Sequence, residues 1–197
     1  MKKIASLICL MTTFAGGSFL YADAELNDAL RLISYEPYYF ENGYILLNKV
    51  NAQETTVFID VESSEGMAAR YISANTSESV KVFNINSWSE SEHQYQKFLS
   101  NVIQENQGDR INSIRMSSRE ASNALNLVSE LIYIDCENTD TVYEKILAWV
   151  SHLSQNGVIA GNRWEWHEVE LAVVYAVVDL GLTLNIDGNF WFLKKQE

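Results

Sequence analysis

The segment 131–164 constrains the fold more than any other part of the chain, because it changes hydrophobic period twice. A short apolar run ends at Asp135, apolar residues then follow at helical spacing over 142–153, and a second apolar run, 158–161, comes after an Asn-Gly break. A strand, a helix and a strand in this order form the unit that builds parallel sheets. Ligands bind at the carboxyl ends of parallel strands, so Asp135 and Asn162 lie where a functional site is expected.

The same alternation of strands and helices continues on both sides of this segment. Apolar runs rich in β-branched and aromatic residues predict strands at 56–61, 80–85 and 111–116. Helical spacing predicts helices at 66–74, at 91–107 (closed by Gly108), at 118–127 and at 168–180 (closed by Gly181). Two last runs, 183–186 and 190–193, flank Asp187-Gly188, a strong hairpin signal. The sequence therefore predicts an α/β protein with a seven-stranded, mostly parallel sheet that ends in an antiparallel hairpin.

The first 24 residues have the composition of a secretory signal peptide. Lys2 and Lys3 precede an uncharged, largely apolar stretch, and Ala22 and Ala24 are small residues at positions −3 and −1 of a cut after Ala24. A retained membrane anchor is the alternative, but the stretch is only about as long as the shortest spanning helices and carries glycines and hydroxyl residues. We expect cleavage, export to the periplasm or the medium, and no stable membrane span afterwards.

Charge and cysteine content exclude several classes of function. The formal net charge is −12 and there is no polybasic run, which argues against nucleic acid or an anionic membrane as a partner. Solubility alone explains an acidic surface of this size. Of the two cysteines, Cys9 lies in the predicted signal peptide, so Cys136 has no intramolecular disulfide partner after cleavage. We expect a single domain stabilised by its apolar core.

We divide the chain into the signal peptide (1–24), an amino-terminal helical and aromatic segment (25–54) and one domain (55–197). Two aromatic segments each allow more than one interpretation. The tyrosine-rich stretch 35–44 is a packing cluster, a lid or a docking surface. The run 164–168 is either an aromatic ligand clamp or the acidic amino terminus of a helix.

Several motifs in the predicted sheet carry a family resemblance. Tyr133-Ile134-Asp135, the helix containing Trp149, the run 157–161 (GVIAG) and the ending 190–195 (FWFLKK) resemble a class I S-adenosylmethionine-dependent methyltransferase of the small-molecule type. The resemblance covers about residues 55–195 and implies a three-layer, Rossmann-like methyltransferase fold. These motifs are mainly scaffold positions, so they support the fold more strongly than an activity.

The resemblance also implies a cofactor site at the carboxyl ends of the first four strands. In the family, the acid that Asp60 matches binds the amino group of S-adenosylmethionine or orders the turn, and the glycine that Gly66 matches lets the backbone approach the cofactor. Asp135 is the best-preserved polar position and the candidate catalytic residue. The implied cofactor-binding set is Asp60, Glu62, Gly66, Asn86, Ser117 and Asp135.

Three of these positions depart from the family pattern. Glu62 stands in place of the first glycine of the turn, where its side chain would crowd the cofactor and add a negative charge. Asn86 replaces the acid that takes both ribose hydroxyls, a loss of about 1–2 kcal/mol. Ser117 replaces the residue that reads the adenine; it could still form a hydrogen bond, or it could cap the following helix. Binding of S-adenosylmethionine is therefore expected to be weakened or lost.

A metal centre and a cysteine nucleophile are both unsupported by the sequence. Asn162-Arg163 replaces a pair of acids in the family, so a hard divalent ion has almost no ligands, and we expect no metal. Arg163 is instead a candidate ion-pair partner of Asp135 or Glu165. No motif places a histidine beside Cys136, so an inert thiol is expected.

Two functions follow from these observations. The first is a working methyltransferase that acts on a small hydroxyl- or nitrogen-bearing substrate. The second is an exported, non-catalytic binding or interaction protein with an unidentified protein partner. The substitutions at the implied cofactor site and the predicted export, away from a cytoplasmic cofactor, favour the second.

Overall fold

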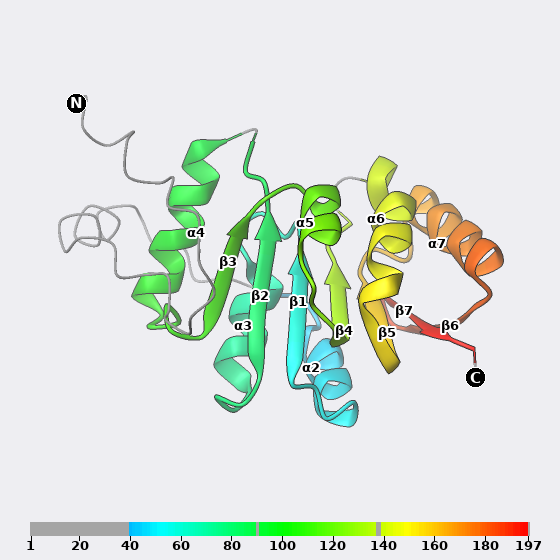
Figure 1. Cartoon of the computed structure of the whole chain (residues 1–197), viewed down its shortest axis with the longest axis horizontal. Coiled ribbons are helices and arrows are strands. Elements are labelled where there is room, and N and C mark those ends of the chain that lie inside the picture. Colours follow the sequence, from blue (N-terminus) through cyan, green and yellow to red (C-terminus); the bar gives the residue numbers. More distant parts are fainter. Residues whose placement is uncertain (1–39, 90, 137–138, 197) are drawn as a thin grey trace.

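The computed structural model describes residues 40–89, 91–136 and 139–196, and within them seven strands form one sheet (Figure 1). Their order is β3-β2-β1-β4-β5-β7-β6. Strand β7 is antiparallel to both of its neighbours, and every other pair is parallel. The predicted sheet and its reversed strand are thus confirmed. The strands are β1 Val57–Val61, β2 Lys81–Asn86, β3 Ile111–Arg115, β4 Ser129–Ile134, β5 Leu153–Gly161, β6 Leu182–Asp187 and β7 Phe190–Lys195.

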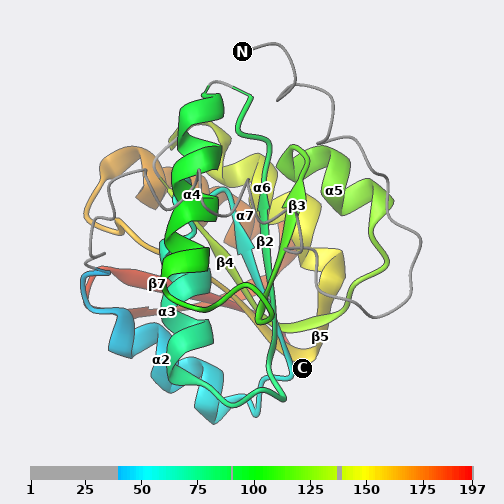
Figure 2. The ribbon, with the colours of Figure 1, turned by 90° about the vertical axis from the view of Figure 1, so that its left-hand side faces the viewer.

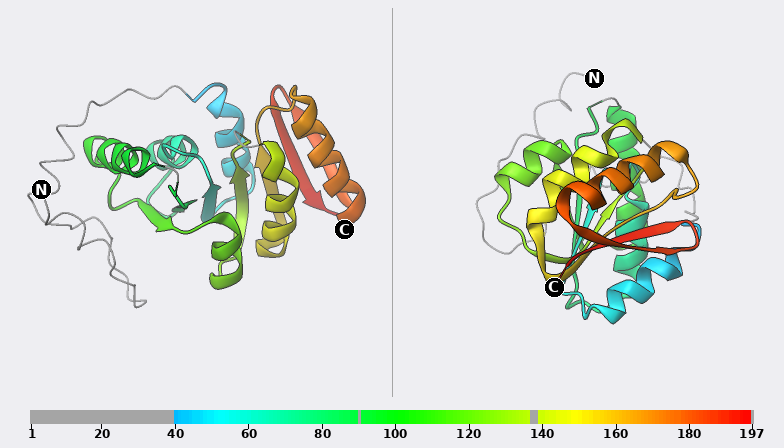
Figure 3. Two further views of the ribbon diagram at one scale, coloured as in Figure 1. Left: turned by 90° about the horizontal axis from the view of Figure 1, so that it is seen from above. Right: turned by 90° about the vertical axis from the view of Figure 1, so that its right-hand side faces the viewer.

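Helices cover both faces of the sheet and complete three layers (Figures 2 and 3). One face carries α2 Gly43–Ala52, α3 Met67–Asn75 and α4 Glu92–Gln104. The other carries α5 Ser118–Ala124, α6 Val142–Trp149 and α7 His167–Leu180. Two short 3₁₀ turns, η2 Thr139–Thr141 and η3 Val150–His152, flank α6. Among the described residues, no helix is both long and apolar enough to cross a membrane. The predicted signal peptide lies outside these residues.

The strands alternate their side chains between two apolar clusters, one beneath each helical layer. Phe58 and Tyr133 pack with α2, α3 and α4, whereas Ile59 and Ile132 pack with α6 and α7. Central strands that are buried on both faces read as continuous apolar runs, which is why the sequence pattern reveals them so clearly.

Phe40, the first described residue of the predicted aromatic stretch 35–44, packs against other aromatic rings. The Phe40 ring lies 5.8 Å from the rings of Tyr71 and Tyr133 and 6.1 Å from that of Phe190, measured between centroids. Tyr44 is exposed at the start of α2. The rest of the tyrosine-rich stretch, 35–39, lies outside the described residues.

Two helices end earlier than their apolar spacing predicts. Helix α4 stops at Gln104 because Asn106, not Gly108, takes the left-handed conformation (φ 55°). The Gln107 and Asn106 amides then bond to the carbonyls of Val102 and Ile103, which satisfies the helix end. Helix α5 stops at Ala124, because the chain turns extended at Leu125.

The Asn-Gly pair at 156–157 lies inside β5, whereas the sequence suggested a break before the strand. Strand β5 begins at Leu153, and its pairing with β4 shifts between Ser129↔Leu153 and Leu131↔Val158, so the extra residues form a bulge. A Cβ at Gly157 would lie 2.9 Å from the Ser129 carbonyl oxygen, which explains the glycine. The C-terminal turn is likewise one residue later than predicted, at Gly188-Asn189.

Candidate functional site

The candidate site is the place at the carboxyl ends of β1 and β4 where the chain connections diverge, which we call the crevice because open α/β sheets bind ligands there. From β1 the chain passes through α3 to β2, toward one edge of the sheet, and from β4 it passes through α6 to β5, toward the other. Ligands of open α/β sheets bind at such a switch point. The six predicted cofactor residues lie at the ends of β1 and β2 (Asp60 and Asn86) or just after β1, β3 and β4, so they lie along this edge.

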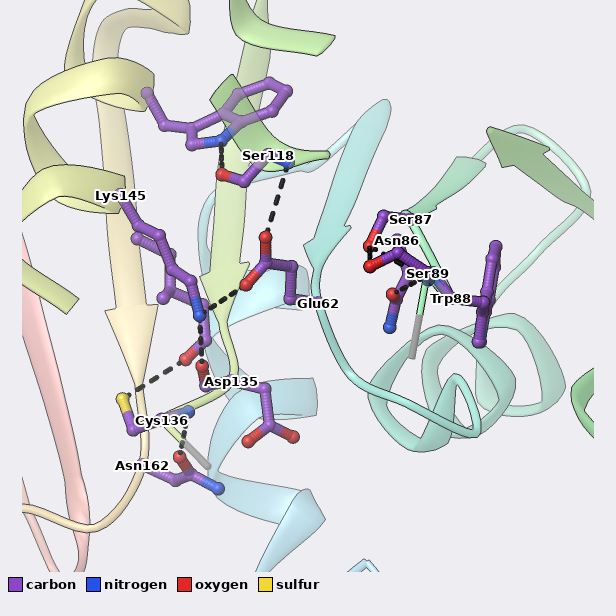
Figure 4. Close-up of polar contacts among 12 residues, drawn as sticks. Glu62, Asn86, Ser87, Trp88, Ser89, Ser118, Asp135, Cys136, Lys145 and Asn162 are labelled. Carbon is purple, nitrogen blue, oxygen red and sulfur yellow. Dashed lines mark hydrogen bonds and ion pairs between the residues drawn. The ribbon is translucent and has the colours of Figure 1, made fainter. Parts of the chain in front are cut away.

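Glu62 follows β1, and both oxygens of its carboxylate are bound by other residues (Figure 4). The Lys145 Nζ of α6 lies 2.7 Å from Glu62 Oε2, and the backbone N–H of Ser118, at the start of α5, donates to Glu62 Oε1 at 3.3 Å. Lys145 Nζ also donates to the Asp135 carbonyl oxygen at 3.3 Å. A single network therefore joins the ends of β1 and β4 to the two helices behind them.

The local backbone aims Glu62 into this network. Glu62 has φ 62°, a left-handed conformation that favours glycine, and its N–H donates to the Ile85 carbonyl at 2.7 Å. Its side chain remains 27% exposed, whereas that of Lys145 is only 4% exposed. The side chain thus lies between α5 and α6, and its partner Lys145 was not among the predicted site residues.

Lys145 was missed although the sequence carries a signal for it. Val142, Ile146 and Trp149 form the buried stripe of α6, and Lys145 sits on the same stripe. A lysine among apolar helix positions needs a buried anion or carbonyl oxygens nearby, because desolvation of an unpaired ammonium is unfavourable. Glu62 and the Asp135 carbonyl supply these groups.

Asp60, at the end of β1, is fully buried and orders the turn that follows. Its Oδ2 accepts hydrogen bonds from Ser63 Oγ (2.6 Å), the Ala69 N–H (2.9 Å) and Asn84 Nδ2 (3.1 Å). Its Oδ1 has no hydrogen-bond partner among the described residues. Burial raises the pKa of Asp60 to about 7, and the negative charge of Asp135 acts in the same direction, against the lowering effect of the hydrogen bonds. The turn-ordering role is the one this geometry supports.

Gly66 starts α3 in a conformation and a space that admit no side chain. Its φ is 66°, and a Cβ would lie 2.5 Å from the Phe98 ring. The preceding turn is closed by the Gly66 N–H, which donates to the Ser63 carbonyl at 2.8 Å. The glycine is therefore required by the fold itself, whether or not a ligand approaches the turn.

Asn86, at the end of β2, uses its carbonyl oxygen within its own loop. Asn86 Oδ1 accepts from the Trp88 N–H at 2.9 Å, and the Trp88 indole donates to the Ser64 carbonyl at 2.7 Å and stacks on Phe98. Figure 4 shows this group apart from the Glu62 network. An aspartate here would have a second carboxylate oxygen for a ligand, and asparagine has none.

Ser117 is the N-cap of α5, which confirms the capping alternative. Its Oγ accepts from the Glu120 N–H at 3.3 Å, and the Glu120 carboxylate accepts from the Ser117 N–H at 3.1 Å and from its hydroxyl at 2.7 Å. The Ser117 hydroxyl lowers the pKa of Glu120. In this capping box, both the backbone N–H and the hydroxyl of Ser117 are hydrogen-bonded to Glu120.

Asp135 is buried at the end of β4, and the residues beside it tie β4 to β5. The Asp135 N–H donates to the Val61 carbonyl at 3.1 Å, and Figure 4 shows its carboxylate directed away from Lys145. The Cys136 N–H donates to Asn162 Oδ1 at 3.2 Å, and the Asn162 carbonyl accepts from Trp191 Nε1 at 3.1 Å. Asn162 therefore links the end of β4 to Trp191 of β7.

The thiol and the aromatic run show no reactive arrangement. Burial raises the pKa of Cys136 to about 12, which disfavours the thiolate. Helix α7 begins at His167 with Trp166 as its N-cap, so the run 164–168 is a helix start, and the Arg163 guanidinium lies 4.4 Å from the Trp166 ring centroid. In the described part of the chain, no three His, Cys, Asp or Glu residues are grouped so that they could hold a metal ion.

Comparison with known proteins supports the fold. Neither a protein-family model nor a curated protein sequence matches the chain. Among solved structures, it is similar to a protein from Staphylococcus aureus proposed to be a caffeoyl-CoA O-methyltransferase (TM-score 0.69, 13% identity, 87% of this chain and 91% of that chain). It is also similar to the S-adenosylhomocysteine-bound methyltransferase PaMTH1 from Podospora anserina (0.65, 12%, 88% and 87%). An O-methyltransferase from Bacillus cereus in complex with S-adenosylhomocysteine is a third match (0.62, 12%, 90% and 94%). The chain therefore has the Rossmann-like fold of S-adenosylmethionine-dependent methyltransferases.

Proposed function

We propose that this chain is an exported, non-catalytic interaction protein on a methyltransferase fold, in which the Glu62–Lys145 pair occupies the cofactor crevice. The observation that carries the proposal is the network that joins Glu62, Lys145, the Ser118 N–H and the Asp135 carbonyl across the switch point. Every polar group of this network forms a hydrogen bond or an ion pair with another residue of the protein.

The free energy of displacing Glu62 is more than half of the free energy of weak cofactor binding. A ligand that pushed Glu62 aside would leave the ammonium of Lys145 buried without its anion, and breaking a buried pair in this way costs about 3–5 kcal/mol. A dissociation constant of about 100 μM corresponds to about −5.5 kcal/mol. A penalty of about 3 kcal/mol would weaken it to the order of 10 mM.

The other polar positions along this edge support the same conclusion. The side-chain oxygens of Asn86, Ser117 and Asn162 each accept a hydrogen bond from a backbone N–H of this chain. The ribose and the adenine would therefore have to compete with these contacts or bind without them. Export, predicted from residues 1–24, would also place the protein away from the cytoplasm, where S-adenosylmethionine is made.

A methyltransferase that acts on a small hydroxyl- or nitrogen-bearing substrate is the second candidate. It is favoured by the bound S-adenosylhomocysteine in the P. anserina and B. cereus structures and by the retention of Asp60, Gly66 and Asp135 at the matching strand ends. Methyl transfer depends mainly on alignment of the two reactants, so a strong base is not essential. In this case Glu62 would have to leave the crevice when the cofactor binds.

Calorimetric titration with S-adenosylmethionine and S-adenosylhomocysteine separates the two candidates. We expect no heat from the purified protein at millimolar ligand, and binding at about 100 μM or tighter would favour the enzyme. The double variant Glu62→Gly/Asn86→Asp should gain binding, because it removes the occupying side chain and restores an acid at the end of β2. If the variant folds and gains nothing, this explanation of the loss is wrong.

A further inference from the structure

Helix α7 presents an apolar stripe to solvent on the face opposite the one that packs on the sheet. Its inner face, Val169, Val173 and Ala176, is fully buried. The outer face carries what we call the α7 stripe, with exposed fractions between 41% and 72%. Figure 3 (right) shows α7, in orange, on the outside of this end of the molecule. The α7 stripe consists of Leu171, Val174, Tyr175 and Val178.

The stripe is a concentrated feature of the surface. Its residues follow the spacing i, i+3, i+4, i+7, which places them on one helix face. Trp166 and Ile186 are also large, exposed and apolar in the same stretch of chain. Elsewhere on the described surface, exposed large apolar side chains occur singly, at Tyr44, Met116, Val128 and Leu147. An apolar patch gathered on one element indicates an interaction surface, whereas scattered apolar residues are ordinary.

The segment of chain that carries the stripe is acidic, and His167 is its one basic residue. Residues 164–193 contain no lysine or arginine. The nearest such residues are Arg163, which lies over the Trp166 ring, and the exposed Lys194 and Lys195, of which Lys195 Nζ donates to the Leu153 carbonyl. The same segment has five exposed acids: Glu165, Glu168, Glu170, Asp179 and Asp187.

We infer that the α7 stripe docks a cationic amphipathic helix of another protein, one with apolar residues along one face and lysine or arginine beside them. The apolar stripe would bury the partner's apolar face, and the surrounding acids would attract its basic residues. A second copy of this chain fits poorly, because it would bring two acidic rims together in a protein of net charge −12. The inference rests on the interaction role proposed above and names the chemistry of the partner, but it does not depend on closure of the crevice.

Synthetic peptides test the inference directly. The probe is a Leu–Lys peptide of about 18 residues, or five helical turns, with leucine at helical spacing on one face. Two controls are a peptide of the same composition in scrambled order and a Leu–Glu peptide with the same leucine spacing. We expect the probe to bind with a dissociation constant of about 10 μM at low salt, and each control to bind at least about tenfold more weakly. High salt should weaken binding of the probe, because exposed charges are screened.

Variants of the protein then locate the binding. Val174→Ser/Val178→Ser should raise the dissociation constant of the probe about tenfold, a loss of about 1.4 kcal/mol, and Val128→Ser, an exposed valine elsewhere, should not change it. Glu170→Lys should also weaken binding at low salt, because it reverses one charge beside the stripe. The matched charge control is Glu78→Lys, at another exposed site. Thermal unfolding checks that each variant is folded.

Three results would overturn the inference. The first is absence of probe binding at about 1 mM, and the second is an equal loss in Val128→Ser or Glu78→Lys, which would indicate general charge attraction. The third is a dimer of the unmodified protein that Val174→Ser/Val178→Ser dissociates, since the occupant would then be a second copy. Cofactor titration reports separately on the crevice, so failure of this inference and failure of the proposed function give different results.

Discussion

Neutralising Glu62 should destabilise the protein much more than neutralising an exposed acid. Glu62→Gln leaves the Lys145 ammonium, which is 4% exposed, with only neutral acceptors. Breaking a buried pair costs about 3–5 kcal/mol, and we expect about 3 kcal/mol because Glu62 is partly exposed and water can approach that side. At roughly 2–4 °C per kcal/mol, the melting temperature should fall by about 6–12 °C.

A double-mutant cycle isolates the interaction between the two side chains. Lys145→Met removes the buried cation and leaves the more accessible carboxylate, so we expect a smaller loss of about 1–2 kcal/mol. The double variant Glu62→Gln/Lys145→Met should lose no more than Lys145→Met alone, because a neutral pair needs no counter-charge. The coupling free energy is then about 3 kcal/mol, equal to the loss in Glu62→Gln and at the upper end of the range measured for residues in contact.

Urea unfolding followed by tryptophan fluorescence measures each free energy. The control is Glu92→Gln, which removes the partner of Arg115 in a salt bridge exposed on both sides and should change stability by at most about 1 kcal/mol. Additivity within about 0.5 kcal/mol, or a loss in Glu62→Gln no larger than in Glu92→Gln, would refute the reasoning.

Three further predictions concern Asp60, Gly66 and Cys136. Burial raises the pKa of Asp60 from 3.8 to about 7, so the folded state binds this proton more tightly than the unfolded state does. The free energy of unfolding should therefore fall by about 4 kcal/mol as the pH rises from about 4 to about 7. Urea unfolding of Asp60→Asn over the same pH range should not show this fall. Gly66→Ala should lower the free energy of unfolding by about 2–4 kcal/mol in the same assay, because the new Cβ would clash with Phe98. The control is Gly181→Ala, at φ 60° with no atom within 4 Å of the Cβ position, which should lose about 1 kcal/mol. Equal losses in the two variants would contradict the steric argument. Cys136, with a pKa of about 12, should react with a thiol reagent only after unfolding, and fast labelling of the folded protein would show that it is accessible.

Much of the fold could be predicted from sequence, because the central strands are buried on both faces and separated by turn residues. The sheet, its reversed strand and the starts of α3 and α7 followed from apolar period, glycines and acidic first turns. Helix α5 ended earlier than predicted, and a residue from another element contacts the chain at this end. His152 of η3 has one ring nitrogen 2.9 Å from the Ser122 carbonyl and the other 3.0 Å from the Leu127 carbonyl. Such tertiary contacts leave no trace in local periodicity.

The strand-end positions of the candidate residues could be predicted, whereas their hydrogen-bond partners could not. Strand ends located Asp60, Asn86, Ser117 and Asp135, but their hydrogen-bond partners depend on loops that the sequence pattern does not specify. The partner of Glu62 lies on a helix that belongs to a different βα unit. The sequence indicates this partner only through Lys145, a lysine on the apolar stripe of a helix. Its position predicts a nearby anion but does not identify which residue supplies it.

Calorimetric titration of the unmodified protein with S-adenosylmethionine tests the central claim most directly. Occupation of the crevice by Glu62, held by Lys145, predicts no measurable binding at millimolar ligand. A dissociation constant of about 100 μM or tighter would contradict the claim, since it would show that the cofactor displaces the ion pair at little cost.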